Sequence, residues 1–213
     1  ATLGGANVGG TNPVTGTFTA GSVTATGSRV AISSGTKIAN GSDAYTITAS
    51  AQDANGNLNT SAATTFSFSA PGTGAALSAT SCTTATSGAN AGTCSVSLTA
   101  TTAGSYSVTA TLGGTNLGGT NPVVGTFAAG SVTAAGSRVS LSSGPKTANG
   151  TDAYTITVAA NDADGNLNTS AASTFNFSAP GTGAALSATT CTTATTGASA
   201  GTCSVTLTAT VAG

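Results

Sequence analysis

The feature that most constrains this chain is an internal repeat. Residues 1–104 align with residues 110–213 at a constant offset of 109 without insertion, and 83 of the 104 aligned positions are identical. A chain that repeats itself at the length of a small domain folds as tandem copies of that domain. Near-identity between copies is typical of long tandem arrays, so we expect two modules sampled from such a row.

The clearest local pattern lies in residues 42–70, which return as residues 151–179. Apolar residues alternate with Thr and Ser on both sides of a turn, at Tyr45, Ile47, Ala49, Phe66 and Phe68. This period of two is typical of strands with one buried face. The intervening residues 53–57 are rich in Asp, Asn and Gly, which favour turns. We therefore expect a β-hairpin over residues 42–70 that packs against a second sheet.

The module boundaries are shifted relative to those of the repeat. Alternating runs and turn signals over residues 21–128 indicate about seven short strands, the spacing of an antiparallel β-sandwich. We call residues 21–128 module one and residues 129–213 module two. Residues 1–20 are predicted to be a terminal strand segment that completes a preceding or neighbouring module.

Module two lacks the counterparts of residues 106–127, which are the last strands of module one. A sandwich without them exposes an unpaired edge and an open core. Two ways to fill the gap stay open. Either the chain continues, or residues 1–20 of another copy insert as a donated strand through Val14 and Phe18.

Charge limits the partners of the chain. Charged residues make up 4% of it and the formal net charge is −1, so electrostatics gives no reason to bind nucleic acid or an anionic membrane. The sequence contains no run of about 20 apolar residues for membrane insertion. Low charge suits a chain held in an assembly with copies of itself in line, or one covered with glycan.

Module one contains, in this order, the segments SDAYTITASAQDANGN, TFSFSAPGTG and GTCSVSLTATTAGSYSVTATLGG. Together these segments resemble bacterial immunoglobulin-like domains of the invasin and intimin type. The resemblance covers nearly the whole repeat and implies an all-β fold of tandem immunoglobulin-like antiparallel β-sandwiches. It also implies a place in a surface adhesin or an extracellular fibre, with Tyr106 at the tyrosine corner of the domain. The chain departs from that family in its low charge and its added cysteine pair.

Each repeat carries two cysteines at the same spacing. Zinc sites usually need four ligands, and without His each module offers only two. We therefore predict one disulfide in each module, joining Cys82 to Cys94 and Cys191 to Cys203. Such bonds indicate an oxidising, extracellular or cell-surface location.

The turn of the central stretch is also a candidate calcium site. Asp162, Asp164 and Asn166 place oxygen atoms at alternate positions, like the start of a calcium loop. The corresponding residues of module one are Asp53, Asn55 and Asn57. The alternative is a plain turn, because a Leu occupies the position of the loop glycine and no Glu closes the loop. We expect no other cofactor.

The absence of His and Glu from the sequence leaves no catalytic triad and no conventional pair of nucleophile and base. We therefore predict that the chain is not an enzyme. We expect a structural repeat module of an extracellular bacterial filament or surface stalk, assembled head-to-tail with strand donation between copies as an option. The alternative is an adhesin segment that binds glycan or another cell surface.

Overall fold

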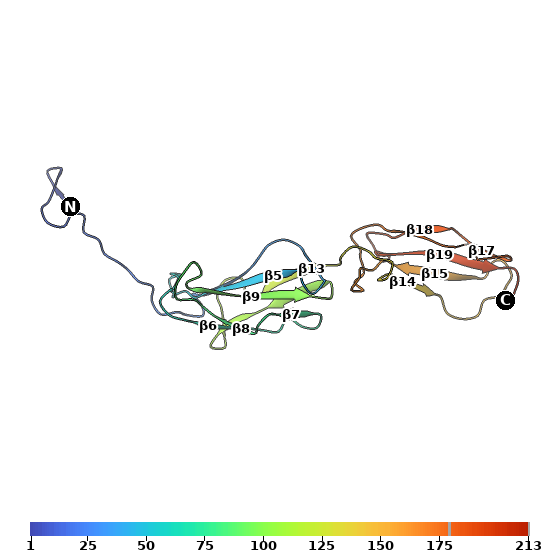
Figure 1. Cartoon of the computed structure of the whole chain (residues 1–213), viewed down its shortest axis with the longest axis horizontal. Helices are drawn as coiled ribbons and strands as arrows, with labels where there is room; N and C mark the ends of the chain where they lie inside the picture. Colours follow the sequence, from blue (N-terminus) through green and yellow to red (C-terminus); the bar gives the residue numbers. More distant parts are fainter. Residues whose placement is uncertain (179, 213) are drawn as a thin grey trace.

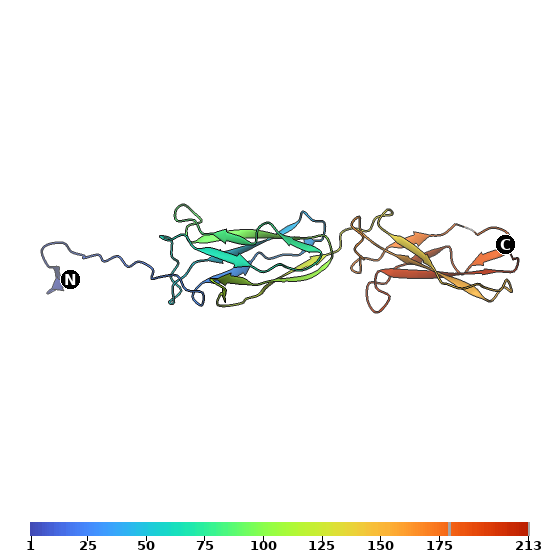
Figure 2. The same ribbon diagram turned by 90° about the horizontal axis from the view of Figure 1, so that it is seen from below.

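The computed structural model describes residues 1–178 and 180–212 as nineteen β-strands joined by turns and loops. Ala179, at the end of the second central stretch, and Gly213, the last residue of module two, lie outside this description. The two modules lie end to end, and the segment before module one extends away from both (Figures 1 and 2). No helix of membrane-spanning length and hydrophobicity occurs in the described part of the chain.

One sheet of module one has the antiparallel strand order β3–β5–β9–β7. The bounds are Arg29–Ile32 for β3, Ala44–Ser50 for β5, Thr93–Ala100 for β9 and Ala75–Leu77 for β7. The long central strands form where apolar and polar residues alternate, so that Tyr45, Ile47 and Ala49 are buried on one face.

The facing layer consists of two short sheets, with strand orders β12–β11–β6–β8 and β10–β13–β4. Strand β13 pairs antiparallel with β10 and parallel with β4. The bounds are Lys37–Ile38 for β4, Thr65–Phe68 for β6, Ser81–Thr83 for β8, Gly104–Val108 for β10, Ala110–Leu112 for β11, Thr115–Asn116 for β12 and Val123–Ala128 for β13.

The core of module one lies between these layers. Its largest fully buried side chains include Ile47, Phe66 and Phe127. The ring of Phe127 packs edge-on against Tyr45 and Tyr106, at centroid distances of 5.2 and 6.0 Å. The Tyr106 hydroxyl donates a hydrogen bond to the Thr102 carbonyl at 2.8 Å, the geometry of a tyrosine corner.

The predicted hairpin over residues 42–70 is wrong. Strands β5 and β6 belong to opposite layers, and β6 pairs with β8 and β11 instead. The chain turns back only locally, where Gln52 pairs with Leu58. It then leaves the sheet, because the Asn59 side chain accepts hydrogen bonds from the backbone N–H groups of Ser61 and Ala62 and redirects the backbone.

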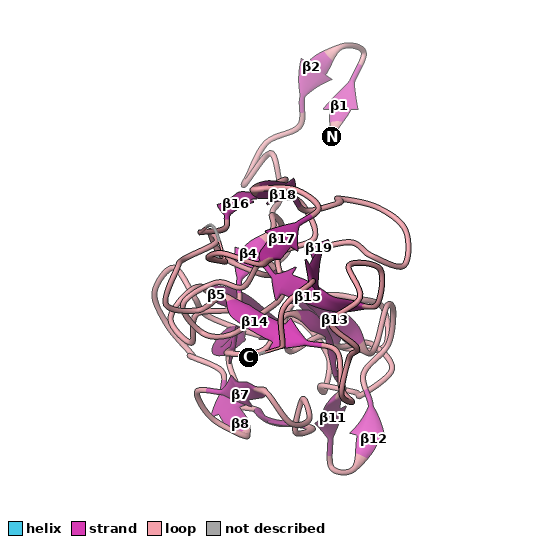
Figure 3. Ribbon diagram, turned by 90° about the vertical axis from the view of Figure 1, so that its right-hand side faces the viewer, coloured by secondary structure: helices cyan, strands magenta, loops and turns pink. Residues whose placement is uncertain are grey.

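Module two repeats one sheet of module one in full and the facing layer only in part. Its sheets have the orders β14–β15–β19–β17 and β16–β18, and Figure 3 shows these strands joined by loops. The bounds are Arg138–Leu141 for β14, Ala153–Ala159 for β15, Thr174–Asn176 for β16, Ala184–Leu186 for β17, Thr190–Thr192 for β18 and Thr202–Ala209 for β19. Its described residues contain no counterparts of β4 and β10–β13.

The segment before module one forms a small hairpin of its own. Strands β1 (Thr2–Leu3) and β2 (Ala6–Asn7) pair with each other and with none of the other strands among the described residues. An extended stretch then leads to Gly21, where module one begins. The segment therefore keeps its local structure without packing on a module.

Candidate functional site

An aspartate at the head of a tight turn organises one end of each module. In module two, Asp162 Oδ1 accepts hydrogen bonds from the backbone N–H groups of Asp164 and Asn166, at 3.0 and 2.8 Å. In module one, Asp53 makes the same pair of contacts at 2.9 Å each. An ionised carboxylate suits this position because it accepts several donors at once.

The same carboxylate holds the chain that enters the module. Asp162 Oδ2 accepts a hydrogen bond from the Gly130 N–H at 2.7 Å, and the Asn168 side chain donates to the Gly130 carbonyl at 2.7 Å. Both polar groups of one linker residue are thus fixed. The equivalent residues of module one are Gly21, Asp53 and Asn59, with distances of 2.8 and 2.9 Å.

These donors keep the two carboxylates ionised. The Asn57 side chain, followed by backbone N–H groups, lowers the pKa of Asp53 to about 2. For Asp162, burial raises the pKa, but hydrogen bonds from Gly130 and Asn166 outweigh burial and the pKa lies below its usual value. Both turns therefore carry a negative charge at neutral pH.

Asn166 extends from this turn into module one. Its Nδ2 lies 3.1 Å from the Ala39 carbonyl oxygen and 3.0 Å from that of Thr101, and its Oδ1 accepts a hydrogen bond from the Ala103 N–H at 2.9 Å. The side chain is only 8% exposed. A single amide thus satisfies three backbone groups of the neighbouring module, which would otherwise have to be hydrated or left unpaired.

The module one side of the junction is a set of loops at one end of the sandwich. Ala39 follows β4, and Thr101 and Ala103 lie between β9 and β10. The Ala39 N–H donates to the Ala128 carbonyl at 2.9 Å, which ties the first loop to the end of β13. Only Ala129 separates that strand from Gly130, so the linker is short and hydrogen-bonded. The junction can hold the two modules at one angle.

The candidate calcium residues lie in these turns. The Asn166 side chain donates to Asp162 at 3.1 Å and the Asn57 side chain to Asp53 at 3.0 Å. Asp164 and Asn55 reach these carboxylates through their backbone N–H groups, and both residues are exposed. Both carboxylate oxygens of the buried Asp in each turn face N–H donors, which occupy the lone pairs that a cation would need. No cluster of three or more metal-binding side chains occurs in the part of the chain described. Calcium binding stays a prediction for titration.

The four cysteines form two disulfides within the modules. Cys82 is bonded to Cys94 with an S–S distance of 2.00 Å, and Cys191 to Cys203 at 2.02 Å. Cys82 lies on β8 and Cys94 on β9, so the bond connects the two layers of the sandwich. Each disulfide therefore fixes the layers to each other near one edge.

The two residues proposed for strand donation project into solvent. Val14 is 82% exposed and Phe18 is 98% exposed. Neither contributes to the core of module one in this structure.

Residues 27–127, nearly all of module one, match the family model described as bacterial Ig-like domain, group 1. Module one is a bacterial immunoglobulin-like domain. Module two repeats its sequence at the offset of 109. The Ig-like fold explains the two facing layers and the tyrosine corner of module one. No curated protein matches the chain.

Solved structures support the same fold. Invasin, described as a bacterial integrin-binding protein, is 21% identical over 90% of this chain, with a TM-score of 0.52. The Escherichia coli adhesin FdeC is 21% identical over 90% of this chain, with a TM-score of 0.50. The chain spans 36% and 58% of the length of these two proteins. At this identity the likeness establishes the fold alone.

Sequence reasoning missed the role of Asn166. The residue stands in an Asp-Gly-Asn-Leu-Asn run that also occurs in module one, with Asn in place of the Asp, and there the corresponding Asn57 is exposed. Because the two Ig-like modules share this run, no local signal separates a junction residue from a surface residue. The short linker before Gly130 was the one available hint, since it places the turn against the preceding module.

Proposed function

We propose that this chain is a structural repeat of an extracellular bacterial stalk or filament, in which Ig-like modules join head-to-tail at a fixed angle. The observation that carries the proposal is the Asn166 junction. Three hydrogen bonds to backbone groups of module one, added to a pinned linker, restrain rotation about the single connection between modules. Such restraint suits a spacer, because the end-to-end length of the joined modules then stays constant.

The composition and the disulfides support this proposal. Each disulfide lies within a module, where it limits local unfolding without affecting the junction, and such bonds persist in oxidising extracellular surroundings. A chain with 4% charged residues is poorly suited to independent dispersion and better suited to an assembly.

The second candidate is an adhesin segment that recognises glycan or another cell surface. It is favoured by the fold shared with invasin and FdeC, whose descriptions name them as an integrin-binding protein and an adhesin. Aromatic side chains commonly form ligand surfaces. In module one the rings of Tyr45, Phe66, Tyr106 and Phe127 are instead buried in the core, which favours the structural role.

The proposal is tested by comparing Asn166→Ala with Asn57→Ala. Both side chains donate to the Asp of their own turn, at 3.1 and 3.0 Å, but only Asn166 contacts another module. We expect small-angle X-ray scattering to show a fixed end-to-end shape for the parent chain and for Asn57→Ala. The Asn166→Ala variant should populate bent shapes.

Circular dichroism of both variants controls for loss of folding. A parent chain that already samples many inter-module angles would refute the structural role of the junction. Binding of the parent chain to a glycan array, with an interaction site mapped to a module surface, would favour the adhesin candidate.

A further inference from the structure

Module two has an uncovered apolar face. Val139 on β14 is 69% exposed, whereas its counterpart Val30 in module one is 7% exposed. Tyr154, Ile156 and Leu207 are likewise less buried than Tyr45, Ile47 and Leu98. The difference arises because β10, β11 and β13 cover this face in module one. Uncovered apolar patches of this kind mark sites of association.

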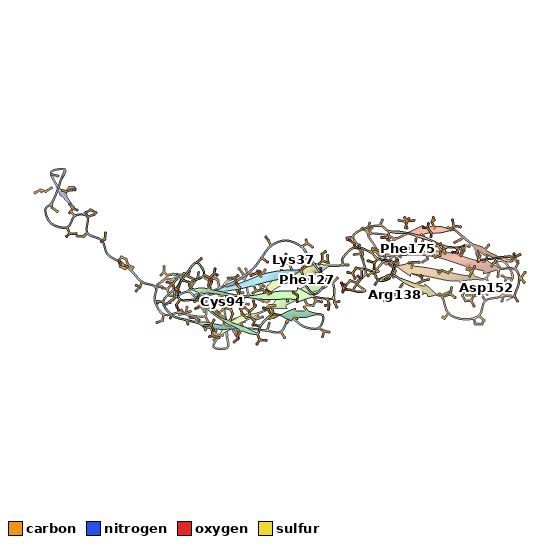
Figure 4. All side chains as sticks on the ribbon, in the orientation of Figure 1. Lys37, Cys94, Phe127, Arg138, Asp152 and Phe175 are labelled. Carbon is orange, nitrogen blue, oxygen red and sulfur yellow. A yellow bond between two sulfur atoms is a disulfide. The ribbon has the colours of Figure 1, made fainter. Side chains whose placement is uncertain are left out.

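At the far end of this face is a pocket of about 250 Å³ lined by residues that include Lys146, Tyr154, Leu207 and Ala209. In module one the equivalent place is filled by β13. Phe127 packs on Tyr45 and pairs with Lys37 across the parallel strands. Figure 4 shows Lys37 and Phe127 at the end of module one that faces module two, and Asp152 at the far end of module two. The pocket therefore has the environment that a phenylalanine from a β13-like strand requires.

A strand of that sequence lies at the start of the chain. Residues 2–18 match residues 111–127 at 14 of 17 positions, and Phe18 corresponds to Phe127. The match extends to conformation. Strands β1 and β2 pair in the register of β11 and β12. The Asn12 side chain donates to the Ala1 carbonyl at 2.7 Å, as Asn121 donates to Ala110 at 2.8 Å.

The Asp53 turn of module one has polar groups corresponding to those of the Asp162 turn, which forms the junction in module two. The Asp53 turn holds Gly21 as Asp162 holds Gly130, but Asn57 is exposed. The backbone groups that would receive its amide are those of Ala148, Thr210 and Ala212, which match Ala39, Thr101 and Ala103 at the offset of 109. They lie in the loops at the far end of module two, beside the open face. The two ends of the chain thus carry the two halves of the observed junction.

We propose that a second copy of this chain covers the open face of module two, with its residues 14–19 lying as β13 does in module one and its Asn57 turn docked on the far-end loops. This inference rests on the proposed head-to-tail function and names its partner and register. Phe18 of the incoming copy lies opposite Lys146, and Thr19 opposite Thr147, as Phe127 and Ala128 lie opposite Lys37 and Ile38.

The incoming segment supplies counterparts of β11, β12 and β13. The proposed contact consists of backbone pairing along one strand edge, burial of the Phe18 ring and hydrogen bonds from the Asn57 side-chain amide. Because the hairpin and the turn are already formed in the free chain, little ordering is needed on association. Module two should therefore bind this segment and turn of a second copy in preference to an unrelated apolar strand.

Gly16 gives the sharpest test. Its counterpart Gly125 lies so close to the core that a Cβ would meet Tyr45 at 2.8 Å and Leu98 at 3.1 Å, whereas a Cβ on Gly16 of the free chain meets nothing within 4 Å. The variant Gly16→Val therefore leaves the free chain undisturbed and blocks the docked strand. Thr17→Val is the matched control, because its counterpart Thr126 points away from the core.

Sedimentation velocity of the full chain should show oligomers whose size grows with concentration. We expect Thr17→Val to behave as the parent and Gly16→Val to lose the oligomers. A parent that stays monomeric at the highest attainable concentration, or a Gly16→Val variant that assembles like the parent, would overturn the proposal.

A photo-crosslink tests the register. With Phe18 replaced by p-azidophenylalanine, in a mixture of ¹⁴N and ¹⁵N chains, irradiation should join residue 18 of one copy to the peptide containing Tyr154 or Leu207 of another. Crosslinks to other regions alone, or the absence of any crosslink between copies, would contradict the proposed position of Phe18. Neither outcome depends on the angle between modules within one chain, so scattering from the Asn166→Ala variant tests the proposed function separately.

Discussion

At the scale of single residues, the structure depends on a few polar groups that are fully used. Asp53 and Asp162 each accept backbone and side-chain donors, and Asn166 pairs with three backbone groups of the other module. In a chain with so few charges, each of these groups determines where the backbone turns. The contribution of each group to stability can therefore be measured with a single substitution.

The Asp53 turn predicts a pH dependence. The pKa of Asp53 in the folded chain is about 2, below the usual value of 3.8. A lowered pKa contributes stability that is present above the unfolded value and is lost as the pH falls. We expect the melting temperature to fall as the pH drops from about 3.8 towards about 2. Asp53→Asn should lower the melting temperature at neutral pH and flatten part of this dependence. An unchanged profile in that variant would contradict the assignment.

The tyrosine corner predicts a defined loss. Tyr106→Phe removes the hydrogen bond to the Thr102 carbonyl and keeps the ring in the core. We expect the free energy of unfolding to decrease by about 1 kcal/mol, the usual net value of such a bond. Urea denaturation measures it. An equally stable variant would show that water replaces the hydroxyl at no cost.

At the scale of elements, strand positions follow from the sequence more readily than strand partners do. The alternation around Tyr45 and around Phe66 places β5 and β6, because a period of two has no helical alternative in runs rich in Thr and Ser. The alternation does not show that β6 belongs to the opposite layer. That depends on Asn59, whose side chain directs the backbone away from the sheet after the turn.

Strand β13 provides a prediction at this scale. A Cβ at Gly125 would meet Tyr45 and Leu98 at 2.8 and 3.1 Å. Gly125→Val should therefore destabilise module one by roughly 1–3 kcal/mol through overpacking. Gly16→Val is the internal comparison and should leave the unfolding of the monomer unchanged. Equal effects of the two substitutions would mean that β13 does not pack as described.

The disulfide between the two layers provides another prediction. Replacing both Cys82 and Cys94 with Ser should lower the free energy of unfolding of module one by about 3 kcal/mol, the value expected for a closed loop of this length. Thermal unfolding under non-reducing conditions measures the change. The transition of module one should move to lower temperature while that of module two stays in place, and an unchanged transition of module one would argue against a stabilising role.

At the scale of the whole molecule, sequence alone indicates two modules but not how they meet. The repeat and the resemblance to immunoglobulin-like domains predict tandem sandwiches, and the family match of residues 27–127 agrees with them. The junction could not be predicted, because Asn57 and Asn166 stand in nearly the same run and differ only in what lies beside them. Only the folded chain shows that one of the two crosses to a neighbour.

The central claim is that the Asn166 junction holds the modules at one angle. Residual dipolar couplings of the full chain in a weakly aligned medium test it most directly, because each module reports its own alignment. The account predicts that both modules share one alignment tensor, in size and orientation, and that Asn166→Ala separates them while Asn57→Ala does not. Independent tensors for the two modules in the parent chain would contradict it.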